Sequence, residues 1–430
     1  ELSNFRDGKE VEEKWFEVFN YYINNEKWKR KLENSLKALN FNVQPEKIDK
    51  NIVQKLYGNI LKTSVSRLEQ YQSCPFSYYL KYGLKLSERE ELKIQPVDTG
   101  TFMHDVIDSF FEEVDNKGIN IKRIEEDTIN TIVDEIIEEK LNIKKNYIFT
   151  SIPKYVVLAN RLKRVIKTCM IYIVDSLKYS DFEVMGHELE FKNGKEFPAI
   201  QIDLEDGRKV EITGKIDRID IAKTPDGNYI RIIDYKSSSK DINLNEMIAG
   251  LQLQLITYLD AVCNIEEVIP AGMLYFTLNE QKLSKKISEE NIKDELRKKF
   301  KMKGLILADV DIVRKMDNKL ESGYSEIIPV YLKTNGEIKM KDNIITRQQF
   351  ENLQKYANKL IKQISNEILS GNIDVKPFYK IKGGATPCKY CKYKSICNFN
   401  NGICKKQYNY IGNESKDYIL DNLRSLEVTR

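Results

Sequence analysis

The chain has 430 residues, of which 41% are hydrophobic and 31% charged, and its formal net charge is +4. This length is enough for two or three domains, or for one elaborated domain with a large core. The balanced charge excludes a polybasic protein but not a nucleic-acid binder whose basic residues are locally grouped.

The termini and cysteines indicate a cellular setting. No run of about 18 apolar residues exists that could span a bilayer. The sequence starts at Glu1 without a methionine or an apolar leader, which predicts a piece excised from a larger intracellular protein. Seven cysteines are an odd number and too sparse for a disulfide scaffold in a chain of this length. Three of them have metal-ligand spacing, which favours a reducing compartment. We therefore expect a cytoplasmic protein.

The first 180 residues are predicted to be mainly helical. Charged segments with helical periodicity run from residue 11 to about residue 62, and we expect residues 1–62 to be a helical lead-in from a preceding domain. Ser64 or Ser66 is a candidate cap for an aromatic-rich helix that ends near residue 84. Further helices are predicted near residues 97–114 and over residues 121–180, where Gly and Pro are few.

The period changes at residue 182. Alternating segments predict strands at residues 182–192, 198–223 and 229–239, with turns at EDGR and TPDG. A single amphipathic helix is predicted over residues 246–262, followed by a short apolar strand at 271–278. This order predicts an α/β core with a mixed sheet over residues 181–280. Residues 281–350 are expected to be an insertion, before a last helix over 349–369.

The first chemical constellation comprises GKIDRID, residues 214–220, and IIDYKSS, residues 232–238. Side chains alternate along a strand, so Asp234 and Lys236 point the same way, opposite to Tyr235. Asp217 lies on the preceding strand, where it can approach Asp234 across an antiparallel ladder. Two converging carboxylates need a cation, and hard oxygen ligands select Mg²⁺ or Mn²⁺. The pattern is also compatible with solvated charges at strand ends, although the apolar residues before Asp234 indicate a buried strand.

These segments carry a resemblance to a known family. GTFMH (100–104), GKIDRID, DYKSS and QLITYLDA (254–261) occur in the order of the motifs of RecB-type PD-(D/E)XK nucleases. Nearly the whole chain resembles the C-terminal nuclease region of the AddB-like family, whose members are subunits of helicase–nucleases. SRLEQYQSCPFSYYLKYGLKL (66–86) and KGLILADVDIVRKMD (303–317) extend the likeness. The resemblance implies a restriction-endonuclease-like core with helical additions, and a helicase-like domain before residue 1.

The resemblance also implies roles for particular residues. His104, Asp217 and Asp234 match the metal-binding residues of the family, and Lys236 matches its catalytic lysine. Gln254 and Tyr258, one helical turn apart, match a pair that lines the cleft. By itself, His104 is more typical of an ordinary, partly buried histidine. Glu188 in HELEF is either a further acidic contributor or simply a polar position of an alternating strand.

A second constellation is TPCKYCKYKSIC, residues 386–397, which contains Cys388, Cys391 and Cys397. Three thiolates need a fourth partner. Cys404 would complete a local zinc site, whereas Cys169 and Cys263 lie in apolar segments typical of buried core thiols. The family resemblance implies instead that Cys74 joins the three in a [4Fe–4S] cluster.

Such a cluster would tie the segment around residue 74 to the segment that begins at residue 388. Closing a loop of this length stabilises the fold by on the order of several kcal/mol. The cluster is therefore expected to be a structural staple, within a nuclease domain spanning residues 63–404 and followed by a tail, 405–430.

The residues together with the resemblance thus imply a Mg²⁺-dependent deoxyribonuclease domain, and the resemblance further implies single strands as its substrate and an AddA-like helicase–nuclease subunit as its partner. No G-x-x-x-x-G-K-[ST] motif indicates an ATPase motor. Lysines in KKFKMKG, residues 298–304, are candidates for phosphate contacts, or are a solvated charged face. The alternative function is a catalytically inactive, cluster-stapled module for DNA binding or subunit docking. The intact set of His104, Asp217, Asp234 and Lys236 argues against that alternative.

Overall fold

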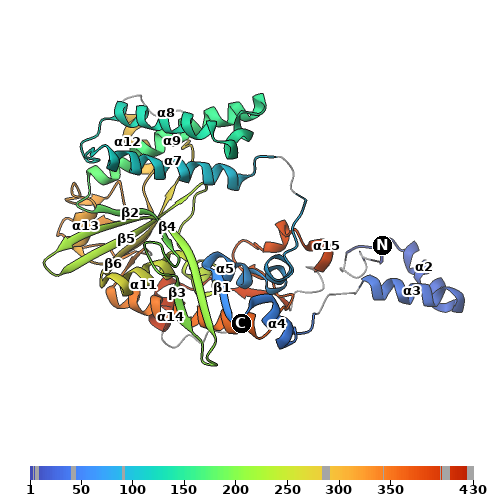
Figure 1. The fold of residues 1–430 in the computed structure, drawn as a ribbon. Coiled ribbons are helices and arrows are strands. Elements are labelled where there is room, and N and C mark those ends of the chain that lie inside the picture. Colours follow the sequence, from blue (N-terminus) through green and yellow to red (C-terminus); the bar gives the residue numbers. More distant parts are fainter. Residues whose placement is uncertain are drawn as a thin grey trace.

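A mixed β-sheet lies between two groups of helices in the computed structural model of the chain (Figure 1). The structure describes residues 1–2, 4, 9–39, 45–89, 93–282, 291–341, 343–397, 399 and 407–423. None of the helices in these ranges is both long and apolar enough to cross a membrane.

Within the described ranges, eight strands form the main sheet, in the order β1-β4-β5-β6-β7-β10, with β2 and β3 also pairing with β4. Their bounds are β1 Ile60–Ser64, β2 Glu183–Phe191, β3 Ile200–Asp203, β4 Lys209–Thr224, β5 Gly227–Lys236, β6 Ile269–Thr277, β7 Lys303–Leu307 and β10 Ile344–Ile345. Short pairs form separately, as β8 Gly323–Tyr324 with β9 Tyr331–Leu332, and β11 Phe378–Lys380 with β12 Asn409–Ile411. The predicted mixed α/β sheet is confirmed: β4 and β5 are antiparallel, whereas β5 and β6 are parallel.

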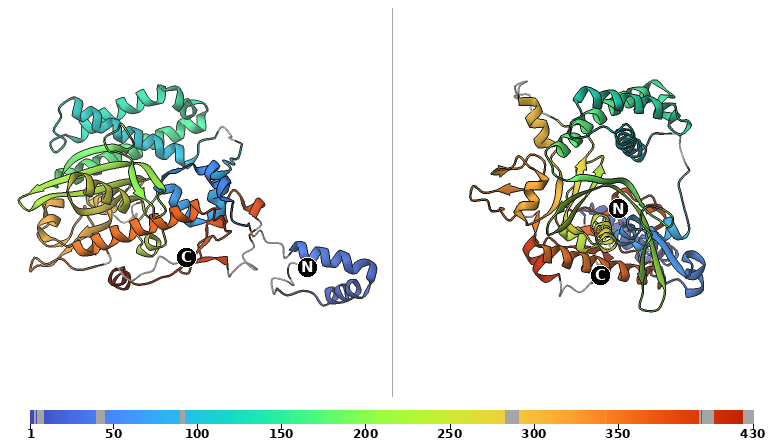
Figure 2. Two further views of the ribbon diagram at one scale, coloured as in Figure 1. Left: turned by 60° about the horizontal axis from the view of Figure 1, so that its bottom comes forward. Right: turned by 60° about the vertical axis from the view of Figure 1, so that its left-hand side comes forward.

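Helices cover both faces of this sheet. Figures 1 and 2 show α7, α8 and α9 stacked over one face, and α11 with α14 under the other. The longer helices are α2 Lys14–Asn24, α3 Glu26–Leu39, α4 Lys50–Tyr57, α5 Val65–Ser73, α7 Pro96–Asn116, α8 Glu126–Asn142, α9 Pro153–Lys178, α11 Gln254–Glu266, α12 Ile292–Lys299 and α14 Arg347–Leu369. The shorter ones are α6 Pro75–Tyr78, α10 Leu244–Ile248, α13 Val310–Met316, α15 Lys394–Cys397 and α16 Lys416–Asn422, with η1 Tyr79–Gly83, η2 Lys144–Thr150 and η4 Pro387–Tyr390.

Helix α7 starts and packs as its sequence dictates. Pro96 occupies the first turn, and Gln95 and Asp98 form a reciprocal capping box that satisfies free backbone N–H groups. Its apolar residues Val106, Phe110 and Val114 recur at helical spacing and are buried. Packing of this stripe over the sheet directs the polar position His104 toward the strand ends.

One predicted helix is wrong. Residues 246–262 form two helices, α10 and α11, separated by a break at residues 249–253. The backbone of Gly250 has φ +78°, and a Cβ there would lie 2.7 Å from the Gln72 side chain. The break is therefore fixed by a close approach of α5, and a new helix begins at Gln254. Its N-terminus is capped from outside, because Glu69 Oε1 accepts the N–H groups of Leu253 and Gln254 at 2.7 and 3.2 Å.

The segment expected to be an insertion contributes strands to the sheet. β7 pairs antiparallel with β6, and β10 pairs parallel with β7. The strands β4, β5 and β6 consequently lie inside the sheet, where both of their faces are covered. Burying a charge costs free energy unless the charge is paired, so the charged residues on β4 and β5 need partners.

Candidate metal centre

Three carboxylates lie side by side on neighbouring strands. His187 pairs with Arg218 and Leu189 with Ile216, which places Glu188 on β2 opposite Asp217 on β4. The β4–β5 ladder ends at Arg218 and Ile233, so Asp217 and Asp234 are the next facing residues. Aligned neighbours project from the same side of a sheet. The register alone therefore collects Glu188, Asp217 and Asp234 in one row.

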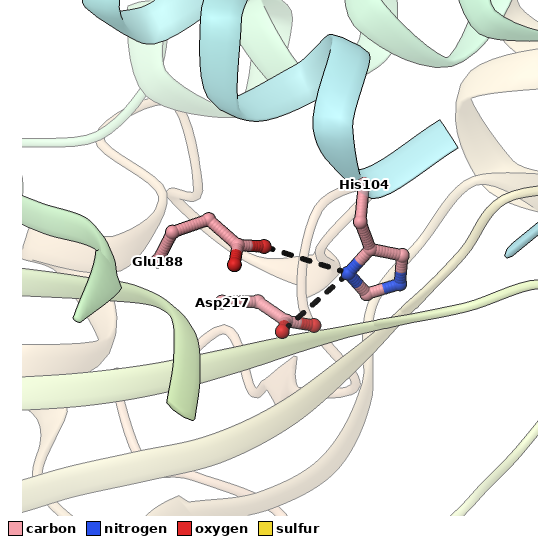
Figure 3. Close-up of side chains that lie close together, drawn as sticks. All are labelled: His104, Glu188 and Asp217. Carbon is pink, nitrogen blue, oxygen red and sulfur yellow. Dashed lines mark ion pairs between the residues drawn. The ribbon is translucent and has the colours of Figure 1, made fainter. Parts of the chain in front are cut away.

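His104 completes this row from above the sheet. Its Nδ1 lies 3.7 Å from Glu188 Oε1 and 3.5 Å from Asp217 Oδ1 (Figure 3). Its Nε2 lies 3.1 Å from the carbonyl oxygen of Tyr235. A carbonyl only accepts, so Nε2 carries a proton and Nδ1 is the ring nitrogen that faces the acids; Nδ1 offers a lone pair to a cation when the ring is neutral. One donor atom each from His104, Glu188 and Asp217 lies within 4.8 Å of the others.

The acids are held in a largely buried arrangement in which their charges repel. Burial and the charge of Asp217 raise the pKa of Asp234 to about 6, although its ion pair with Lys236 acts in the opposite direction. Burial of His104 favours its neutral form, but the hydrogen bond to Asp217 and that residue's charge raise its pKa overall. Glu188 also forms an ion pair with Lys215. Without a bound cation, Asp234 and His104 therefore favour holding protons.

Tyr235 links the site to a buried ionic cluster. Its backbone N–H donates to Asp217 Oδ2 at 2.7 Å, and its hydroxyl accepts from Arg218 Nη1 at 3.1 Å. Asp220 accepts from both Arg218 and Arg231, at 3.1 and 2.8 Å, and all three side chains are buried. Paired buried charges of this kind resist rearrangement, because any displacement leaves a charge uncompensated. Tyr235 is thereby fixed in place.

The structure brings Tyr258 near this row, close enough for the charges of Asp234 and Asp217 to act on its hydroxyl. Tyr258 is buried and stacks on Phe191 with ring centroids 5.4 Å apart. A Cβ on Gly214 would lie 2.0 Å from the Tyr258 hydroxyl oxygen. The glycine of GKIDRID therefore leaves space for this tyrosine. Gln254 is the first residue of α11 and is half-buried, one turn before Tyr258.

Glu188 takes a larger part in the site than its sequence context indicated. It has φ +51°, a conformation that costs a non-glycine residue free energy and that clusters at functional sites. Next to it, His187 Nδ1 lies 2.6 Å from Asp108 Oδ1, one turn beyond His104 on α7. Alternation along HELEF was compatible with this role but did not require it, since strand pairing decides which residue Glu188 meets.

Four cysteines line one open cavity of about 660 Å³. They are Cys74, Cys388, Cys391 and Cys397. Burial, with a smaller contribution from Cys388, raises the pKa of Cys74 to about 12. Neutral thiols in this setting become thiolates when a metal cation displaces their protons. The donor set is soft and all four residues line a common cavity, which suits a soft metal centre such as an iron–sulfur cluster. No three of these sulfur atoms lie within 4.8 Å of one another in the described part of the chain, so the thiols are not already gathered around a single small ion.

The other cysteines fall into two groups. Cys169 is fully buried in α9 and Cys263 packs against the main core from α11, where burial raises the pKa of each thiol. Cys404, the alternative fourth ligand, lies outside the described residues. Cys74 is therefore the one described cysteine outside the C-terminal trio that lines the same cavity as the trio, and its role as a fourth ligand stays a prediction.

A sequence model of the PD-(D/E)XK nuclease superfamily matches residues 62–398. The chain belongs to this superfamily. A model of the fifth domain of the ATP-dependent helicase/deoxyribonuclease AddB matches residues 1–38. In this PD-(D/E)XK nuclease, both constellations found in the sequence therefore fall within the segment matched to the superfamily.

Curated relatives extend the likeness over almost the whole PD-(D/E)XK chain. It is 38% identical to the B subunit of the ATP-dependent helicase/deoxyribonuclease of Clostridium tetani over 426 residues, which is 97% of this chain and 37% of that protein. The corresponding B subunit of Clostridium novyi is 38% identical over 95% of this chain and 36% of its own length. The chain thus spans little more than a third of the length of these relatives.

Proposed function

We propose that this chain is the nuclease domain of an AddB-like helicase–nuclease subunit and hydrolyses phosphodiester bonds in single DNA strands during the processing of broken ends for recombination. The observation that carries the proposal is the row Glu188, Asp217 and Asp234 beneath His104. The ion pairs of Glu188 with Lys215 and of Asp234 with Lys236 offset the repulsion among these acids only in part, because the pKa of Asp234 is still raised, so a shared divalent cation would stabilise the row.

The donor set fits Mg²⁺ or Mn²⁺. Carboxylate oxygens are the ligands that such hard cations prefer, and an imidazole nitrogen is compatible with Mn²⁺. His104, Glu188, Asp217 and Asp234 would hold the ion. A divalent cation bound there supplies a water of lowered pKa and stabilises negative charge on a phosphoryl oxygen.

The chain's own residues prepare the site for this chemistry. The Tyr235 carbonyl holds the proton of His104 at Nε2, so that Nδ1 stays a lone-pair donor. Lys236, on the same face as Asp234, is the cation available to orient the attacking water or to stabilise the charge that develops on the phosphate. The N–H of Tyr235 fixes the rotamer of Asp217.

The test is cleavage of a fluorescent single-stranded oligonucleotide with Mg²⁺ or Mn²⁺, comparing the wild type with Asp234→Asn. The matched control is Asp226→Asn, which removes one carboxylate from the exposed turn of the same hairpin. We expect activity to be lost in the first variant and kept in the second. Equal cleavage by the wild type and Asp234→Asn would assign the activity to a contaminant and favour the inactive docking module.

We further propose that Cys74, Cys388, Cys391 and Cys397 hold a [4Fe–4S] cluster with a structural role. Its support is the convergence of these residues on one cavity from segments far apart in the sequence. The cluster would tie α6 to the segment around α15. No redox step is required of it.

The proposed partners follow from the relatives' names. These proteins are each called the B subunit of an ATP-dependent helicase/deoxyribonuclease, so we propose an AddA-like helicase–nuclease subunit as the partner. Single strands released by unwinding would be the substrate.

A further inference from the structure

The row of carboxylates continues across the sheet as a tyrosine and a lysine. Asp234 pairs with Tyr275 on β6, and Tyr275 pairs with Lys303 on β7. Aligned neighbours project to the same side, so Lys303 lies two strands from Asp234 on the side of the sheet that carries the acids. Figure 1 shows β5 and β6 adjacent at this part of the sheet.

Ammonium groups gather around this end of the row. Lys240 Nζ lies 5.0 Å from the centre of the Tyr275 ring, and Lys236 Nζ lies 6.0 Å from it. Lys303 Nζ donates to Ser239 Oγ at 2.7 Å, which places it next to the loop that follows β5. Two ammonium groups therefore lie near the ring of the buried Tyr275, and a third belongs to Lys303, which pairs with Tyr275 on the neighbouring strand.

A second group of cations continues outward from the first. Lys301, two residues before Lys303, has its Nζ 5.8 Å from the centre of the Tyr324 ring. Lys341 Nζ lies 4.5 Å from the same ring and donates to the Tyr324 hydroxyl at 3.0 Å. Tyr324 is 62% exposed. Its ring is held by two lysines and is open to solvent.

The lysines of the two groups differ from the lysines of α12 in their surroundings. Lys301, Lys303 and Lys341 form no ion pair with a carboxylate of the described chain, and Glu326, the acid whose charge acts most strongly on Lys301, is engaged by Arg297 at 3.5 Å. In contrast, Lys298 pairs with Glu295 at 2.9 Å, and Lys299 donates to the Lys282 carbonyl. Within KKFKMKG, only Lys298 is thus neutralised by an ion pair among the described residues. Lys298 and Lys299 lie on α12, whereas Lys301 lies near the Tyr324 ring and Lys303 pairs with Tyr275 in the sheet.

We infer that Lys240, Lys303, Lys301, Lys341 and Tyr324 form a surface, the lysine track, that binds single-stranded nucleic acid beside the scissile bond. The inference rests on the proposed function. A row of acids repels a phosphodiester backbone, so the strand needs cations next to the cleavage site. An exposed ring at the outer end gives an unpaired base a stacking surface, which a paired base in a duplex does not need.

The test compares two double variants of the full chain. Lys301→Ala/Lys341→Ala removes two charges from the lysine track, and Lys298→Ala/Lys299→Ala removes two charges from α12, outside the track. Binding of a fluorescent oligothymidylate is measured by anisotropy with Ca²⁺ in place of Mg²⁺, at several salt concentrations. The first variant should bind roughly tenfold more weakly, with a salt slope shallower by about 1.4, or about 0.7 for each lost phosphate contact. The control should match the wild type.

Three further readouts sharpen the comparison. In cleavage assays, the lysine-track variant should raise KM and leave kcat unchanged. Lys301→Met/Lys341→Met keeps unbranched, largely apolar side chains of similar length without the charge, so an equal loss of affinity assigns the effect to the charges and not to lost packing. Tyr324→Ala should weaken binding, whereas Tyr324→Phe, which keeps the ring, should not. Equal affinities of the two alanine double variants would overturn the inference, and an equal loss on a blunt duplex would overturn its assignment to single strands.

Cleavage and strand binding are measured separately, so the nuclease proposal and the lysine track can each fail alone. Asp234→Asn should abolish cleavage and retain binding. If the wild type does not cleave at all, the nuclease proposal fails, while the anisotropy comparison still decides whether the lysine track binds a strand.

Discussion

The backbone N–H of Tyr235 donates a 2.7 Å hydrogen bond to Oδ2 of Asp217. The same residue accepts from His104 through its carbonyl oxygen and from Arg218 through its hydroxyl. One residue on β5 thus joins the candidate metal site on one side to a buried ionic cluster on the other. The position of Asp217 depends on strand pairing and on the rigidity of this cluster.

Tyr235→Phe should reduce stability more than activity. It keeps both backbone contacts but leaves a buried Arg218 donor without its partner, which costs about 1–3 kcal/mol. Urea unfolding should report that loss, and kcat should stay within severalfold of the wild type. Tyr229→Phe, a change of the same hydroxyl on the same strand, serves as the control. A large loss of kcat at unchanged stability would contradict this structural role of the Tyr235 hydroxyl.

Glu188→Gln should weaken binding of Mn²⁺ by roughly tenfold or more, since it removes one of the charges shared by the ion. Isothermal titration measures the change, with Glu190→Gln on the same strand as the control. An affinity equal to that of the wild type would remove Glu188 from the site.

The left-handed backbone of Glu188 gives a separate prediction. Glu188→Gly should be more stable than Glu188→Ala by about 1 kcal/mol, because only glycine adopts positive φ without a steric cost. At an ordinary strand position the order is reversed. Thermal unfolding of the two variants distinguishes the cases, and alanine being the more stable would contradict the observed conformation.

Acidic pH should weaken metal binding and strengthen the metal-free fold. The pKa of Asp234 is raised to about 6 and that of His104 is also raised. Protons therefore compete with Mn²⁺ below about pH 6. In the metal-free protein, a raised pKa contributes stability that is fully present below the unfolded-state pKa and is lost as pH rises through the folded value. Melting curves between about pH 5 and 8 should show this gain on acidification, and Asp234→Asn should reduce it.

Cys74→Ala should remove iron and visible absorbance from protein purified without oxygen, and should lower the melting temperature. The reason is that one lost ligand opens a tie between distant segments, which is worth on the order of several kcal/mol. Cys263→Ala, outside the cavity, should keep both properties. A colourless wild-type protein with stoichiometric zinc would identify the site as a zinc centre instead.

Gly214→Ala should destabilise the protein by about 1–3 kcal/mol through overpacking against Tyr258. Gly100→Ala is the matched control, because a Cβ there meets nothing within 4 Å and alanine favours the helix. Tyr258→Leu in the Gly214→Ala background should recover part of the loss. Equal stability of the two single variants would show that Tyr258 moves freely.

Local sequence patterns were enough to predict the main strands and the residue types of the two candidate sites. Alternation of apolar and polar residues predicted β2, β4 and β5, and a short apolar run predicted β6. The spacing of Asp234 and Lys236 put both on one face of a strand. The order of motifs and the three clustered cysteines indicated two separate sites. These properties follow from periodicity and side-chain chemistry, which are short-range in the chain.

Only the tertiary structure decided which residues meet. Glu188 joins Asp217 through the register of β2 on β4, the break before Gln254 follows from Gln72 packing against Gly250, and Lys301 separates from Lys298 because a hairpin brings Tyr324 to one of them. Each of these outcomes depends on contacts between segments far apart in the sequence. A shift of one residue in strand pairing would turn Glu188 to the opposite face, and no local pattern specifies that register.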